Sequence, residues 1–125
     1  MPLLAFDFTG AYAPDQGASW IFDDATWKDA NGNPVNMTGY TARMQLRPDH
    51  SAKSKAFDTL GTADLDGTIV LGADGTIAIN VPPSRTVKYT WPAAYYELKV
   101  TSPAGVVTSL LAGRVVPNPA ATFPT

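Results

Sequence analysis

Alternation of apolar and polar side chains is the strongest structural signal in this sequence, and residues 40–48 show it most clearly. There Tyr40, Ala42, Met44 and Leu46 are each separated from the next by one polar side chain. Because successive side chains of a strand point to opposite faces, these four would lie on the same face. The segment therefore predicts a strand with one buried and one polar face.

The same period of two recurs in short segments that glycine and proline separate. Strands are expected at residues 3–8, 19–28, 40–48, 68–71, 77–81, 94–101 and 106–116, with a short edge strand around 56–60. In the segment 19–28, Ala25 and Trp27 break the period, which predicts a β-bulge. Gly113, inside the last segment, indicates a bulge or a close approach of other backbone.

The tetrapeptide Asp-Gly-Thr-Ile occurs twice, at residues 66–69 and 74–77, and could belong to a calcium loop or to a hairpin. Counted from Asp64, position 12 of a calcium-binding EF-hand loop would be Gly75, which has no side-chain ligand. Asp74 and Gly75 instead lie between two alternating segments, the typical place of a β-hairpin turn. We therefore expect a hairpin here and no calcium site.

Two other local signals complete the list of elements. Asn31 and Gly32 predict a tight turn, because both residues tolerate positive φ angles. Ser84 could cap one helical turn over residues 85–90, which Pro92 would end. Short strands with frequent turn residues and so little helix predict an all-β sandwich or barrel.

The length of 125 residues suits one domain with one core. We expect a single β-sandwich domain over residues 1–117 and a proline-rich C-terminal tail over residues 118–125. Three prolines lie among the last nine residues of the chain. This end therefore cannot join a central strand, and it would extend over a neighbouring protein or stay free.

Composition narrows the classes of function. Charged residues make up 16% of the chain, against a usual share of roughly 25%, which indicates a surface partly covered by other protein. The net charge of −2 and the scattered basic residues speak against nucleic-acid binding. The chain contains no cysteine, no apolar segment of membrane-spanning length and no secretory signal. No metal and no other cofactor is expected.

The residues that could support catalysis lack the partners that catalysis needs. His50, the single histidine, lies in a polar segment beside Asp49 and Ser51, and no Gly-x-Ser-x-Gly motif accompanies it. This favours a solvated loop histidine. Asp23 and Asp24 are adjacent on a predicted strand and would point to opposite faces, so they cannot form a carboxylate pair. We therefore expect a protein that is not an enzyme.

Aromatic side chains are the remaining candidates for a binding surface. Trp20 and Tyr96 lie on predicted core faces, whereas Trp91 and Tyr95 are the aromatic residues most expected at the surface. The candidate residues for a subunit interface or a glycan contact are Trp91, Tyr95, Tyr89, Pro117, Pro119 and Phe123. Aromatic faces of this kind could stack against sugar rings.

Four segments in this order resemble small proteins encoded in the structural gene clusters of tailed bacteriophages. They are an aromatic segment with a turn (27–47), a hairpin that ends in prolines (71–84), a tyrosine-containing strand (95–105) and a closing strand (106–116). The order is similar to immunoglobulin-like modules of phage baseplate and tail accessory proteins, among them the N-terminal module of lactococcal-type upper baseplate proteins. The segment 82–94 departs from the more regular short helix of those proteins.

The resemblance implies an immunoglobulin-like antiparallel β-sandwich of about 7–9 strands with at most one short helical turn. It also implies a non-enzymatic structural protein of a virion, assembled in the cytoplasm of the host bacterium and docked on the tail, baseplate, neck or head. Its partners would be other virion proteins in a symmetric homo-oligomeric or hetero-oligomeric assembly, with no nucleic acid and no membrane. The alternative is a carbohydrate-binding module that contacts a host-surface glycan through exposed aromatic residues.

Overall fold

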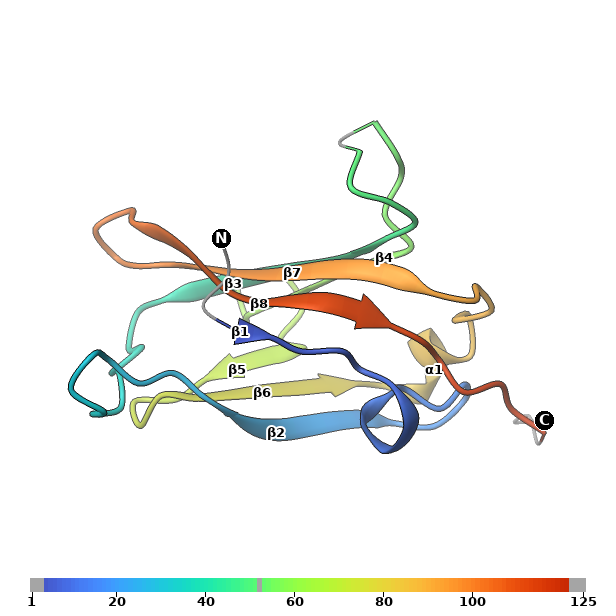
Figure 1. Cartoon of the computed structure of the whole chain (residues 1–125), viewed down its shortest axis with the longest axis horizontal. Helices are drawn as coiled ribbons and strands as arrows, with labels where there is room; N and C mark the ends of the chain where they lie inside the picture. The colour runs from blue at the N-terminus through green and yellow to red at the C-terminus, as the bar shows by residue number, and fades with distance from the viewer. Residues whose placement is uncertain (1–3, 52, 122–125) are drawn as a thin grey trace.

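The chain forms two β-sheets packed face to face, as a computed structural model describes it for residues 4–51 and 53–121 (Figure 1). The eight strands are β1 (Leu4–Ala5), β2 (Trp20–Thr26), β3 (Thr41–Arg47), β4 (Asp58–Gly61), β5 (Ile69–Leu71), β6 (Thr76–Val81), β7 (Ala94–Thr101) and β8 (Val107–Val115). The expected all-β sandwich is confirmed.

The order of the strands is that of an immunoglobulin-like sandwich. One sheet runs β1-β8-β7-β3-β4 and the other β2-β6-β5. In the lettering used for immunoglobulin domains, β8, β7 and β3 correspond to strands G, F and C, and β2, β6 and β5 to strands B, E and D. β1 and β4 are additional strands at the two edges of the first sheet. All neighbouring strands are antiparallel except β1, which runs parallel to β8 with Leu4 opposite Leu111 and Ala5 opposite Ala112.

The core lies between the inner faces of the two sheets. Ala42, Met44 and Leu46 of β3 are buried there, as the alternation predicts, and Tyr40 packs against the core while half-buried. From the other sheet β6 contributes Ile77, Ile79 and Val81, which are also buried. The period of two in both segments thus identified the core-facing side chains correctly.

One bulge and two turns lie where the sequence predicted them. The pairing of β2 with β6 shifts register between Phe22 and Ala25, which confirms the bulge. Gly75 has a φ of 84° in the turn between β5 and β6, a conformation that favours glycine, and the hairpin is confirmed. In the turn at Asn31 and Gly32, only the glycine has a positive φ, of 81°.

Two short helical segments connect the strands. The α-helix α1 (Pro83–Thr86) begins before the residue expected to cap it, because Pro82 takes the capping position and Pro83 the first helical turn. Ser84 is therefore inside the helix. A 3₁₀-helix at Gly10–Tyr12 follows β1 and was not expected from the sequence.

The C-terminal residues lie against the fold as far as the structure describes them. Asn118 accepts a hydrogen bond from the Gln16 N–H and donates its own N–H to the Pro14 carbonyl, both over 2.9 Å. The Ala120 N–H donates to the Gln16 side chain over 3.1 Å. Asn118 and Ala120 thus contact the chain's own N-terminal half, while residues 122–125 of the expected tail lie outside the described residues.

Candidate functional site

The outer face of the five-stranded sheet is a polar groove across β3, β7 and β8. The register places Arg47 opposite Tyr95, Gln45 opposite Glu97 and Arg43 opposite Lys99. The residues that line the groove are Arg43, Gln45, Arg47, Asp49, His50, Tyr95, Tyr96, Glu97, Lys99 and Ala112. Apart from Tyr96, which is buried in the core, these side chains come from the outward-facing positions of the strands and from the loop that follows β3.

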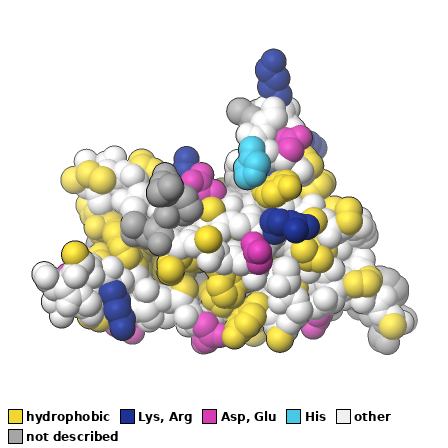
Figure 2. All heavy atoms as spheres, viewed as in Figure 1, with side chains coloured by type: hydrophobic (Ala, Val, Ile, Leu, Met, Phe, Trp, Pro, Cys, Tyr) yellow, Lys and Arg dark blue, Asp and Glu magenta, His cyan; other side chains and the backbone are white. Residues whose placement is uncertain are grey.

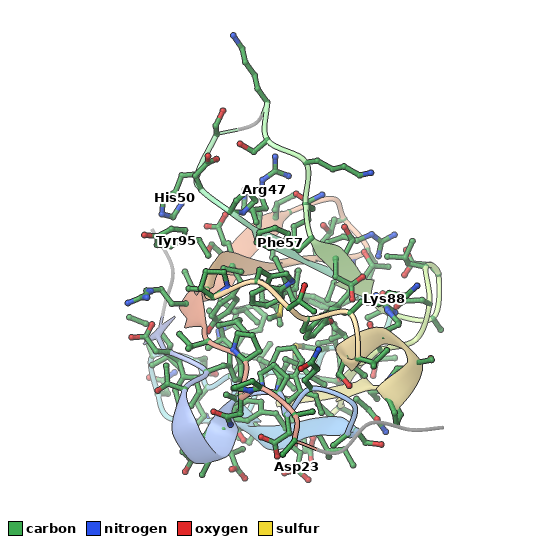
Figure 3. All side chains as sticks on the ribbon, turned by 90° about the vertical axis from the view of Figure 1, so that its right-hand side faces the viewer. Asp23, Arg47, His50, Phe57, Lys88 and Tyr95 are labelled. Carbon is green, nitrogen blue, oxygen red and sulfur yellow. The ribbon has the colours of Figure 1, made fainter. Side chains whose placement is uncertain are left out.

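That loop, residues 48–51 and 53–57, projects from the end of the sheet (Figures 1 and 3), and its Asp49 and His50 form one wall of the groove. Arg47 holds its base, because the guanidinium donates to the carbonyl oxygens of Ser51, over 2.9 Å, and of Ser54. The Asp49 carboxylate accepts from the Ser54 hydroxyl over 2.6 Å and from the Ser51 N–H over 2.9 Å. These hydrogen bonds lower the pKa of Asp49 and keep it ionised.

His50 and Tyr95 meet where this loop passes over β7 (Figure 3). Their ring centroids are 4.5 Å apart. Tyr95 is 38% exposed, and the register places Arg47 on one side of it and Arg114 on the other. Tyr95 is thus a partly exposed aromatic ring on a paired strand, with His50, Arg47 and Arg114 as its neighbours.

Ion pairs fix the charges at the far end of the groove. The Arg43 guanidinium binds the Asp64 carboxylate over 2.8 Å, and this hydrogen bond lowers the pKa of Asp64 to about 2. Glu97 accepts a hydrogen bond from the Ser109 hydroxyl over 2.7 Å and pairs with Lys99 over 3.4 Å. The groove therefore offers both hydrogen-bond donors and ionised acceptors.

A second charged cluster is structural. Arg85 of α1 binds Asp58 over 2.5 Å and Asp66 over 2.6 Å, and the Tyr89 hydroxyl donates to Asp58 over 2.6 Å. Burial alone would lower the pKa of Arg85, but its hydrogen bonds to the two carboxylates outweigh this effect and the pKa is raised. Burial also raises the pKa of the Tyr89 hydroxyl, because it disfavours the charged phenolate. The cluster joins α1 to β4 and to the loop after it, with its polar groups already paired.

The candidate aromatic residues do not form one platform. Tyr89, one of the candidate contact residues, is only 3% exposed and so offers little surface to a partner or a glycan. Trp91 is half-buried and stacks on Phe57 with centroids 5.0 Å apart and planes 7° from parallel. Tyr95 lies in the groove instead, with His50 beside it.

The remaining candidates lie near the C-terminus or in the core. Pro117 is half-buried and Pro119 exposed, in the segment that runs beside residues 14–16. Phe123 lies outside the described residues. Trp20 and Tyr96 are buried, as expected from their predicted core faces.

The catalytic candidates gain no partners from the fold. His50 packs on Tyr95, and Asp23 and Asp24 are both exposed, because the bulge turns the two neighbours outward together. Within the ranges 4–51 and 53–121, no three His, Asp or Glu side chains gather where they could hold a metal ion. No helix among the described residues is long and apolar enough to span a membrane.

An apolar recess opens between the sheets beside β1. It is lined by Leu4, Ala25, Thr26, Trp27, Lys28, Ile77, Leu110 and Leu111, and a hollow next to it continues over Ala5, Phe6, Tyr12 and Phe22. β1 pairs with β8 at Leu111 and Ala112, and among the described residues no strand pairs with residues 107–110 on the same side of β8. In Figure 2 hydrophobic side chains gather in the hollow between the two layers on the left.

Neither surface was predicted from the sequence, because each depends on which strands pair and in which register. The polar face of residues 41–47 is visible in the alternation, but the register that brings Gln45 beside Glu97 is not. The recess depends on the pairing of β1 with β8, and this long-range pairing cannot be read from the sequence either.

Comparison with known proteins gives no match: no family model and no curated protein matches this chain.

Proposed function

We propose that this chain is a non-enzymatic structural protein of a tailed-bacteriophage virion, an immunoglobulin-like module that docks on neighbouring subunits. The support comes from the immunoglobulin-like strand order, which agrees with the fold implied by the sequence resemblance, and from candidate catalytic residues that gain no partners. The observation that carries the docking mode is the apolar recess beside β1 and β8.

The occupant that fits this recess is an extended, apolar segment of a neighbouring virion subunit. It would lie over the recess beside β8, on the side of that strand where Leu4 and Ala5 pair. Unpaired N–H and C=O groups of an edge strand accept such a segment through main-chain hydrogen bonds, while side-chain pockets give specificity. Leu110, Leu111 and Ile77 at the floor would supply the apolar contacts.

The test is mass spectrometry of purified phage particles from the source, separated into heads and tails. Hundreds of copies in the head fraction would indicate a capsid decoration protein, and about a dozen copies with the tail a neck or baseplate component. Absence from both fractions would overturn the proposed function.

The docking mode has its own test, Leu4→Lys with Val70→Lys as the matched control. Both residues are more than half exposed, at 53% and 59%, so neither change should unfold the protein. Leu4 lines the recess and Val70 lies in the other sheet. We expect particles complemented with Leu4→Lys to lose the protein, and those with Val70→Lys to retain it. Equal incorporation of both variants would exclude docking at the recess.

A further inference from the structure

We propose that the groove on the outer face of the five-stranded sheet binds a saccharide, with the ring of Tyr95 as the stacking surface. This inference goes beyond the structural role in a virion and does not depend on it. Its basis is the arrangement of Tyr95, Gln45 and Glu97 and the wall formed by Asp49 and His50.

The size and shape of the groove suit a small polar ligand. Its volume is about 460 Å³, within the range of roughly 300–1,000 Å³ for ligand sites. Ala112 contributes a small side chain to the floor, next to Glu97 in the register. The floor consists of paired strands, so its side chains keep their positions without a ligand, which reduces the entropy lost on binding.

The chemistry of the lining matches a sugar better than other ligands. A pyranose ring has an apolar C–H face that packs on an aromatic ring, and hydroxyl groups that both donate and accept hydrogen bonds at its edge. Tyr95 supplies the ring, while Glu97 and Asp49 supply acceptors and Lys99 supplies donors. The Gln45 amide nitrogen supplies a further donor, while its oxygen already accepts from Arg47 over 2.8 Å.

Other classes of ligand fit this lining less well. An apolar helix or strand would bury the charges of Arg43, Lys99 and Glu97 without replacing their water. The cations of the lining are already engaged, because Arg43 pairs with Asp64, Lys99 with Glu97 and Arg47 with loop carbonyls. A nucleic acid or an acidic peptide would therefore meet the carboxylates of Glu97 and Asp49 without a free cation to offset them. Donors, acceptors and one aromatic ring side by side therefore favour a hydroxyl-rich ligand over a polyanion.

The wall of the groove is held in place before any ligand arrives. Arg47 ties the loop through Ser51 and Ser54, and Asp49 ties the same residues from inside the loop. His50 is thereby kept against Tyr95. The groove shares no lining residue with the apolar recess, so both surfaces can be occupied at the same time.

The experiment is a glycan array of bacterial-surface and reference oligosaccharides probed with the purified chain, followed by calorimetric titration of the bound glycan. We expect Tyr95→Ala to lower the affinity at least tenfold and Gln45→Ala to lower it several-fold. Phe57→Ala is the matched control, because Phe57 is an exposed aromatic residue, at 41%, that stacks on Trp91 away from the groove lining. This variant should bind within twofold of the unchanged chain.

Three outcomes would overturn the proposal: no array glycan bound above background, affinity unchanged in Tyr95→Ala, or affinity lost in Phe57→Ala. Thermal unfolding of each variant shows that it is folded. Amide shifts of Gln45, Tyr95 and Glu97 during a nuclear magnetic resonance titration with the same glycan locate the binding independently of mutation. Because the purified chain is used without particles, failure here leaves the proposed virion role untouched.

Discussion

At the scale of single residues, Gly113 is the point where the N-terminal segment meets the last strand. A Cβ atom on Gly113 would lie 2.1 Å from the carbonyl oxygen of Phe6. The same oxygen accepts a hydrogen bond from the Tyr96 hydroxyl over 2.6 Å. The sequence predicted a bulge or a close approach at this glycine, and the close approach is confirmed.

Gly113→Ala should therefore destabilise the protein by about 1–3 kcal/mol, because the methyl group must push the Phe6 backbone away from β8. Urea unfolding measures the change. Hydrogen exchange should become faster at the amides of Phe6 and Phe8, which donate to Ala112 and Arg114. Ala104→Ser, which adds one atom in an exposed turn, is the control and should leave both measurements unchanged.

Asp58 is the residue on which the Arg85 cluster depends. Asp58→Asn removes the charge that both Arg85 and the Tyr89 hydroxyl contact, in a site where Arg85 and Asp58 are mostly buried. We expect a loss of about 2–3 kcal/mol in the free energy of unfolding. Asp64→Asn breaks a pair of similar geometry at the surface, with Arg43, and should have little effect. Equal losses in the two variants would contradict this account.

At the scale of elements, the local signals predicted strands and turns well, and pairing over long distances not at all. The alternation over residues 40–48 and the Asp74-Gly75 turn specify their structure within a few residues, so the sequence was sufficient for β3 and for the hairpin of β5 and β6. The parallel pairing of β1 with β8 has no local signature. The burial of Tyr89 was not predicted, because the partner of its hydroxyl, Asp58, belongs to a strand far away in the sequence.

The loop over residues 48–57 is the element that projects furthest from the sheet in Figure 1. Arg47→Ala removes the hydrogen bonds that hold its base. Trypsin should then cleave several-fold faster after Lys53 and Lys55, because local opening of the loop becomes easier while the core is unchanged. Arg114→Ala, on the same sheet face but outside the loop, is the control. Unchanged cleavage in Arg47→Ala would mean that other contacts hold the loop.

At the scale of the whole molecule, the two sheets leave two unlike surfaces. The apolar recess lies beside β1 and β8, and the polar groove crosses the outer faces of β3, β7 and β8. One surface suits a main-chain partner and the other a hydroxyl-rich ligand. The sequence could predict the sandwich from its alternation, but neither surface, since each is assembled from strands that meet only in the folded chain.

The pairing of β1 with β8 also imposes an order of events during synthesis. Because β1 pairs with β8, it must wait until the chain has been synthesised past residue 112. At roughly 5–20 residues per second, this delay is on the order of ten seconds. Throughout that time Leu4 and Ala5 have no strand of their own chain to join. A neighbouring subunit that is already folded could capture this end first, so the timing of translation would favour exchange of the N-terminal strand between copies.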